Sequence, residues 1–523
     1  MVAEYGIKYA VHIITTHFGG LVAKVCECLL RKGPLSLPNI TRYTELSPKQ
    51  VKNILLVLIQ HNCVQSFILE QPGGFGDGPK VITHYMPLID NILHRMRFSK
   101  FLRVVSEELD KECEELLEGL LQHGRLSVQQ MLDRAKDTKK QGNNIVLNSI
   151  REILCRLVTA RFVECCPDPE PILTESPPED ATAKKKGAKS AKGKTEEPKS
   201  LEQRVLAAAV PMEAKRFSTA LITESDVGGR APGMTIGEKR KPDALENVTW
   251  KPDALENVTW RANYEECIRR LRHKACIENV ASQLDNDAAV VLKAMIDASR
   301  SEENKIKAEN SGPLSMSSIY EEVIKSESGR NMTLDRVRTH LIQLGTPPFV
   351  RAVDESYIID FNCIIEQAQK EEVESIVLKR YGNDAYSMFR LLLANNGGLL
   401  ETKKISDATF VEKENAQKIL YKLWKGDYLH MEKLEFKLAN LLLWKVNKRT
   451  LWEHVLDEMF HAALNLSRRL AYELEQEKEV LSLPADRRAG PLKDRYERIR
   501  RVRLLLESAQ MKLDDGIMLF HHF

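Results

Sequence analysis

The sequence has few of the features that mark an enzyme, a membrane protein or a secreted protein. It contains no HExxH or GxSxG motif and no paired acidic metal-binding motif. No apolar run approaches the roughly 20 residues that span a bilayer, and the first ten residues lack the layout of a signal peptide. We therefore expect an intracellular, non-catalytic protein that is not associated with a membrane.

Cysteines in metal-ligand or disulfide spacing are also lacking. The ten cysteines are scattered, and none forms a CxxC pair. Several lie inside apolar segments, as Cys155 does between Leu154 and Leu157. We expect reduced thiols and no bound cofactor or metal, with a zinc site as a remote alternative.

A strong excess of one charge is missing as well. The chain has 77 basic and 74 acidic residues, a formal net charge of +3 over 523 residues. Proteins that grip DNA alone usually carry a marked basic excess. Near-neutrality therefore favours a component of a larger assembly.

What the sequence does contain is a short motif that occurs four times. Its first copy is Gly33-Pro34-Leu35-Ser36, which stops an apolar helix. Ser47-Pro48-Lys49-Gln50 then predicts a capping box, and helix-spaced apolar residues follow it. Two strands are expected at residues 64–69 and 81–85. Three helices followed by two strands are typical of a winged helix.

The later copies are less complete but keep the glycine and the leucine. They begin at Gly124-Arg125-Leu126-Ser127, at Gly312-Pro313-Leu314-Ser315 and at Gly397-Gly398-Leu399-Leu400. We predict a mainly α fold with small β-wings, in which four tandem winged-helix domains precede a C-terminal antiparallel coiled-coil hairpin. The expected boundaries are 1–104 for the first winged helix with its N-terminal helices, 105–167 for the second, 256–371 for the third with a helical lead-in, 372–448 for the fourth and 449–523 for the hairpin.

Residues 168–255 differ in composition from the rest of the chain. Prolines cluster there, and lysines such as Lys184, Lys185 and Lys186 stand in a background of small residues. We predict a charged, largely disordered linker with partial order around residues 205–210. Its lysine cluster could be a solvated part of the linker, or could serve nuclear import or contact phosphates. Residues 241–250 repeat identically as 251–260, for which we know no packing role.

Candidate contact residues lie on the expected third helices and on one wing. In the first unit the exposed face of that helix carries Lys49, Lys52, Asn53 and Gln60, and the wing adds Lys80. Arg336 and Arg338 lie on the third helix of the third unit. These side chains could touch phosphates or bases, or could be ordinary solvated positions. The uneven basic bias places protein contact ahead of base recognition.

Three stretches resemble a known family, namely residues 10–19 (AVHIITTHFG), 50–62 (QVKNILLVLIQHN) and 416–423 (AQKILYKL). They are similar to the third-largest subunit of eukaryotic RNA polymerase III. The resemblance implies a non-catalytic nuclear subunit that helps make tRNA, 5S rRNA and other small RNAs. Implied partners are two smaller subunits of the same heterotrimer, the clamp of the largest subunit, the initiation factor TFIIIB and promoter DNA, which is bound weakly and opened.

Two other interpretations remain open. One is a winged-helix scaffold subunit of another nuclear assembly, such as a proteasome-lid or signalosome type. The other is a stand-alone winged-helix transcription factor. Salt dependence separates the last of these, because a protein with many phosphate contacts loses roughly 10³-fold in affinity between about 50 and about 200 mM salt.

Overall fold

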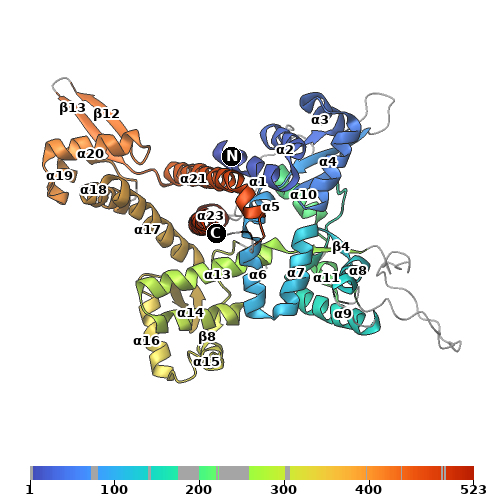
Figure 1. Cartoon of the computed structure of the whole chain (residues 1–523). Helices are drawn as coiled ribbons and strands as arrows, with labels where there is room; N and C mark the ends of the chain where they lie inside the picture. The colour runs from blue at the N-terminus through green and yellow to red at the C-terminus, as the bar shows by residue number, and fades with distance from the viewer. Residues whose placement is uncertain are drawn as a thin grey trace, which may run out of the picture. The chain divides into compact units, whose positions relative to one another are not determined.

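The computed structural model is mainly helical with small β-sheets (Figure 1). It describes residues 4–71, 80–138, 143–174, 200–211, 213–219, 222, 258–300, 307–395, 397–436, 439–484, 487 and 490–523. The chain forms two compact units, one of residues 10–267 and one of residues 1–9 together with 268–523. None of the described helices is long and apolar enough to cross a membrane.

The order helix, strand, helix, helix, strand, strand occurs four times. We call these segments modules one to four. Module one consists of α2 (Gly20–Lys32), β1 (Leu35–Ser36), α3 (Leu37–Thr44), α4 (Pro48–Gln60), β2 (Val64–Gln71) and β3 (Lys80–Pro87). Module two consists of α7 (Lys111–His123), β4 (Leu126–Ser127), α8 (Val128–Thr138), α9 (Asn143–Thr159), β5 (Val163–Cys165) and β7 (Thr259–Ala262).

Modules three and four lie in the other compact unit. Module three consists of α14 (Asn286–Ser299), β8 (Leu314–Ser315), α15 (Met316–Lys325), α16 (Leu334–Leu344), β9 (Val350–Val353) and β10 (Ser356–Ile359). Module four consists of α18 (Asn383–Ala394), β11 (Leu400–Glu401), α19 (Thr402–Thr409), α20 (Lys413–Lys425), β12 (His430–Phe436) and β13 (Ala439–Lys445). In each module the short first strand pairs with the last, which pairs with the strand between them.

Local sequence signals explain how module one is built. Gly33 ends α2 with φ of +80°, and its amide donates to the Leu29 carbonyl at 2.8 Å. The predicted capping box at the start of α4 is present, because Ser47 and Gln50 bond reciprocally. Behind it the buried residues of α4 form one face, and they are Val51, Ile54, Leu55 and Leu58. In module three, Thr333 occupies the N-cap position of α16 but makes no side-chain cap bond.

Module two is closed by a strand from far along the chain. β7 lies between β4 and β5, with Trp260 opposite Cys165 and Leu126. The predicted boundary at residue 167 therefore omits one strand of this sheet. Trp260 is fully buried, and this burial of a large apolar side chain holds β7 in the sheet of module two. The second copy of the repeated decamer ends in β7, whereas the first copy lies outside the described residues.

Part of the predicted linker is folded onto module one. β6 (Ile172–Thr174) pairs in parallel with β2, and α10 (Leu201–Ala209) follows. Val205 of α10 is buried in a cluster with Phe67, Met86 and Leu88. These segments are ordered, because their few apolar residues cover the wing of module one. The lysine cluster at residues 184–194 lies outside the described residues.

The remaining elements connect or flank the modules. α1 (Glu4–Phe18) precedes module one. Three helical segments join module one to module two, namely α5 (Ile89–His94), η1 (Arg95–Arg97) and α6 (Phe98–Glu108). α11 (Glu213–Arg216) follows α10. α13 (Tyr264–Gln283) leads toward module three, and α17 (Phe361–Tyr381) joins modules three and four. The core of module three extends onto α17 through Phe361, Ile364 and Ile365.

The C-terminal segment consists of α21 (Lys448–Gln476), α22 (Lys478–Ser482), α23 (Pro491–Ile517) and a π-helical turn η5 (Met518–His522). α21 and α23 are antiparallel, since Gly516 lies against Met459 at one end and Arg495 pairs with Glu477 at 2.7 Å at the other.

The start of α1 packs on this pair of helices. Gln510, which breaks the apolar stripe of α23 in the sequence, is buried and donates to the Tyr9 hydroxyl at 3.1 Å. The Tyr5 amide donates to Asp457 at 3.1 Å, and the Tyr5 ring stacks on His461. α21 and α23 therefore pack against residues from the opposite end of the chain.

Candidate functional site

The exposed face of α4 is the first part of the candidate site. Lys49, Lys52 and Asn53 are exposed on successive turns of this helix. Residues three and four apart share a helical face, so these three side chains form one polar surface. The capping box fixes the start of α4 and therefore the direction of this surface. The side chain of Lys80, the predicted wing contact, lies outside the described residues.

Apolar side chains interrupt this surface. Leu56 is 66% exposed, and Val57 beside it is also exposed. A helix that reads base edges presents mainly hydrogen-bonding groups. Exposed leucine and valine next to lysine and asparagine instead favour a surface that binds another protein, because burying the two apolar side chains there removes their area from water.

Gln60, the last predicted contact residue of α4, is bonded within the chain. Its side-chain amide donates to the carbonyl oxygens of His123 and Arg125, at 2.9 and 2.6 Å. Gly124, between these acceptors, is so close that an added Cβ would overlap the Gln60 carbonyl group, 2.8 Å from its carbon. Gln60 therefore joins module one to module two, and only Lys49, Lys52 and Asn53 remain as free contact candidates on α4.

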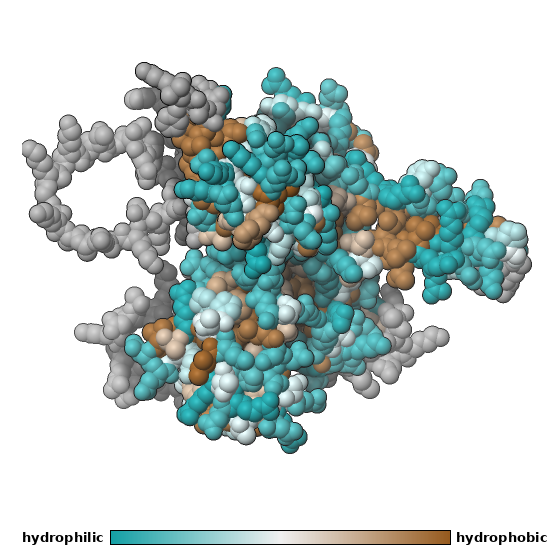
Figure 2. All heavy atoms as spheres, turned by 90° about the vertical axis from the view of Figure 1, so that its left-hand side faces the viewer, coloured by the Kyte–Doolittle hydropathy of each residue, from teal (hydrophilic) through white to brown (hydrophobic). Residues whose placement is uncertain are grey.

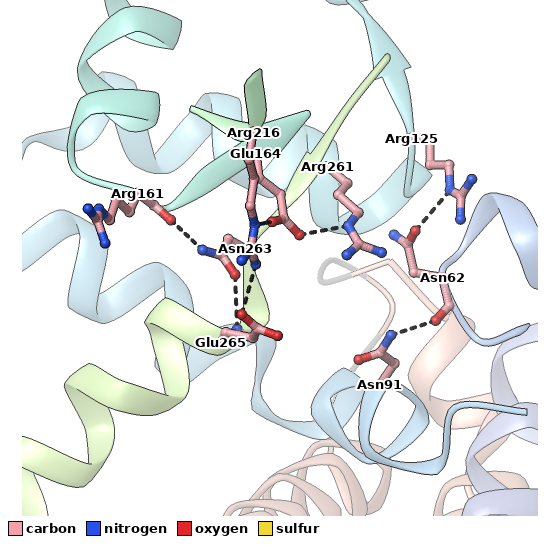
Figure 3. A network of polar contacts seen from close by, with 9 residues as sticks. All are labelled: Asn62, Asn91, Arg125, Arg161, Glu164, Arg216, Arg261, Asn263 and Glu265. Atoms are coloured by element: carbon pink, nitrogen blue, oxygen red, sulfur yellow. Dashed lines mark hydrogen bonds and ion pairs between the residues drawn. The ribbon is translucent and has the colours of Figure 1, made fainter. Parts of the chain in front are cut away.

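A second link between these modules is centred on Asn62 (Figure 3). Arg125 Nε donates to Asn62 Oδ1 at 2.9 Å, and Asn91 Nδ2 donates to the Asn62 carbonyl at 2.8 Å. Asn62 has φ of +57°, a conformation that asparagine tolerates better than most residues. Burial lowers the pKa of Arg125, although its guanidinium still donates to Asn62.

Module two holds a buried charge network, also drawn in Figure 3. Glu164 of β5 is 3% exposed and accepts from Arg261 of β7 at 2.8 Å and from Arg216 of α11. Arg216 also contacts Glu265 at 2.8 Å. Burial, the largest single influence, lowers the pKa values of both arginines. The charges of nearby acidic groups and the hydrogen bonds to Glu164 together outweigh it, so both pKa values are raised. The network attaches α11, from the predicted linker, to the sheet of module two.

Sequence reasoning missed this network. Glu164 stands between Val163 and Cys165 in a strand, and its partners Arg216 and Arg261 lie 52 and 97 residues further on. No local spacing brings such residues together. The available signal was the alternation of polar and apolar residues across residues 259–262 (TWRA), which is typical of a strand.

The predicted contact residues of module three are engaged with carboxylates. Arg336 contacts Asp287 at 2.8 Å, and Arg338 lies 3.7 Å from Asp335. These ion pairs are exposed and therefore weak, so a ligand could displace them. Their positive charges are nevertheless balanced locally, which makes module three a poorer anion-binding surface than α4.

Cys63 and Cys113 lie buried in modules one and two. All ten cysteines of the chain are free thiols. Burial raises the pKa values of Cys63 and Cys113 to about 12, which keeps both protonated at neutral pH. A thiolate is the reactive and ligating form.

Comparison with known families gives three matches along the chain. The model of the RNA polymerase III subunit RPC82 helix-turn-helix domain matches residues 8–68, and that of RNA polymerase III subunit RPC82 matches residues 152–368. The model of the POLR3C C-terminal winged-helix domain matches residues 373–439.

Similar full-length proteins give the same result. The DNA-directed RNA polymerase III subunit RPC3 of Homo sapiens is 23% identical over 491 residues, which cover 91% of this chain and 85% of the human protein. The subunit rpc3 of Dictyostelium discoideum is 22% identical over 674 aligned positions, covering 99% of this chain and all of that protein.

Proposed function

Because the chain belongs to the family of the RNA polymerase III subunit called RPC82 or RPC3, we propose that it is a non-catalytic subunit of DNA-directed RNA polymerase III. The observation that carries this proposal is the extent of the similarity. Relatives named as this subunit align with more than nine-tenths of the chain, and three family models for it match in consecutive segments.

We further propose that all four modules are winged helices and that the C-terminal pair of helices forms a coiled-coil hairpin. The recurring strand order and the antiparallel course of α21 and α23 support this. In this proposal the chain acts in the nucleus as one of three subunits of a heterotrimer on the polymerase clamp. It contacts TFIIIB and assists DNA opening during initiation on genes for tRNA, 5S rRNA and other small RNAs.

The α4 surface is proposed as a contact with protein and only weakly with DNA. Exposed Leu56 and Val57 support protein contact, and the lysines next to them can add contact with phosphates that does not depend on base sequence. Since the formal net charge of the chain is only +3, its affinity for DNA alone is expected to be low.

Tagged purification of the full chain from nuclear extract tests the assignment. We expect polymerase III subunits to co-purify, with two smaller ones still bound after washing at salt that removes the rest. Recovery of proteasome-lid or signalosome subunits instead would refute the proposal. The variant Leu56→Glu/Val57→Glu should lose at least one of these partners. Ile342→Glu, at an exposed position of α16, is the matched control and should retain all of them.

A gel-shift assay with the purified full chain addresses the transcription-factor alternative. We expect weak binding without sequence selectivity. Tight and selective binding that falls steeply between about 50 and about 200 mM salt would favour an independent DNA-binding protein.

A further inference from the structure

A half-buried arginine, Arg95 of η1, pairs with no carboxylate among the described residues. The face shown in Figure 2 is largely hydrophilic, so charged side chains that face solvent are ordinary there. Arg95 differs because its guanidinium lies over two aromatic rings, 4.6 Å from the ring centre of Phe18 and 5.3 Å from that of Phe98. Stacking of this kind engages the face of a guanidinium and leaves the N–H groups at its edge for an anion.

Two buried nitrogen atoms beside Phe18 have no hydrogen-bond partner among the described residues. One is Nε of Arg95, and the other is Nδ1 of His61, whose ring centre lies 4.7 Å from that of Phe18. Buried polar groups are nearly always hydrogen-bonded, and an orphaned one commonly marks the place of an ion or a water. One bound anion explains both atoms, because the two side chains contact the same ring.

The charged groups around these atoms are all basic. Burial lowers the pKa values of His61 and His17, and the positive charge of Arg95 lowers both further. His123 adds to the effect on the pKa of His61, and no carboxylate is among the groups that shift either pKa. Four basic side chains from α1, α4, η1 and α7 therefore gather here, and an anion meets no negative charge that would repel it.

We propose that Arg95 and His61 form a binding site for a phosphate group that carries at least three free oxygens. The Nε and Nη groups of an arginine form a planar fork that binds two phosphate oxygens. His61 donates to a third oxygen from Nδ1 in the tautomer that carries its proton there. A carboxylate has two oxygens, and a phosphodiester of nucleic acid has two that are not esterified, so neither uses all three donors.

This inference does not depend on membership of a polymerase, because it uses only the contacts around Phe18. Isothermal titration calorimetry of the purified full chain with inorganic phosphate, at an ionic strength held constant with sodium chloride, measures the affinity. We expect a Kd of about 1 mM or less. A phosphoserine flanked by two glycines, with unphosphorylated serine as its control, distinguishes a phosphorylated protein from free phosphate as the source by which of the two phosphates binds more tightly.

Two variants remove the donors one at a time. Arg95→Gln and His61→Leu should each weaken phosphate binding at least about tenfold, because each loses a hydrogen bond to a charged group. Arg469→Gln is the matched control and should leave the affinity unchanged. Arg469 also lies over an aromatic ring, 5.6 Å from the centre of Tyr472, but it pairs with Glu473.

The unmodified chain gives a second measurement that does not depend on the folding of a variant. Bound phosphate should raise the pKa of His61 from about 4 to above about 5, because a neighbouring anion favours the imidazolium. A proton NMR titration of the histidine rings, with and without phosphate, follows this change, and His61→Leu identifies the signal.

Three results would overturn the proposal. The first is no heat beyond that of dilution at phosphate concentrations up to about 10 mM, ten times the expected Kd. The second is unchanged affinity in Arg95→Gln or in His61→Leu, or an unchanged pKa of His61. The third is a DNA duplex that displaces phosphate and is itself released by Arg95→Gln, which would make Arg95 a nucleic-acid contact. Circular dichroism of each variant checks that the helices are retained.

Discussion

Replacing Gly124 by alanine should separate modules one and two, whereas the same change at Gly33 should not. The two glycines occupy equivalent positions in the repeated motif, with φ of +81° at Gly124 and +80° at Gly33. Alanine at either position meets the backbone strain of a region that favours glycine, which costs about 1–3 kcal/mol. The difference between the two sites is space, since an added Cβ at Gly33 meets nothing within 4 Å.

At Gly124 the added Cβ would overlap the Gln60 carbonyl group, which is backbone and cannot rotate away. The modules must therefore move apart at this point. Movement breaks the two bonds from the Gln60 amide and the bond from Arg125 to Asn62. At about 1 kcal/mol for each hydrogen bond, Gly124→Ala should cost about 3 kcal/mol beyond the strain shared with Gly33→Ala.

Hydrogen exchange of the full chain is the suitable assay, because a protein of several modules does not unfold in one step. In Gly124→Ala we expect faster exchange at the end of α4 and at β4, with protection elsewhere in modules one and two retained. Gly33→Ala should raise exchange only around α2 and β1. Equal exchange in the two variants, or none above the unmodified chain, would refute the reasoning about close backbone approach.

Three further predictions concern the same compact unit. Glu164→Ala should destabilise module two by about 3–5 kcal/mol, because Arg216 and Arg261 lose their buried partner, and calorimetry should show a lower transition temperature than Glu265→Ala. The pKa of His61 is lowered to about 4, first by burial and then by the charges of Arg95, His123 and His17. Because the unfolded chain takes up this proton near pH 6.5, the contribution of neutral His61 to stability should be full above about pH 6.5 and fall as the pH drops toward 4. In a pH series of thermal unfolding, His61→Gln should lose this part of the dependence of the transition temperature on pH. Val205→Asp should release α10, so that limited proteolysis cuts near residue 205 faster while the helices of module two stay protected.

The parts of the fold that follow from near neighbours in sequence could be predicted. The capping box of Ser47 and Gln50, the turn at Gly33 and the hairpin of residues 350–359 depend on residues a few positions apart. Turn chemistry and periodic burial are visible in such short windows. The expected secondary structure of module one was accordingly close to the elements that the structure describes.

What could not be predicted depends on contacts between distant residues. Gln60 looked like an exposed polar residue because its acceptors at 123 and 125 are supplied by another module. Gln510 is a polar residue between apolar positions of α23, and its partner, Tyr9, lies 501 residues away. The boundary at residue 167 failed for the same reason, since β7 joins β5 only in three dimensions. A polar residue at an apolar position can therefore indicate an unseen partner.

Because β5 pairs with β7, the residues between these two strands connect neighbours in a single sheet. Cys165 and Trp260 face each other on neighbouring strands, so the intervening residues leave and re-enter the same sheet. Adjacent strands lie about 4.8 Å apart, whatever the length of chain that joins them. Insertions or deletions in this segment that leave β6, α10 and α11 intact need not displace β5 from β7. A protease cut within it should leave two fragments that remain together under native conditions and separate only in denaturant.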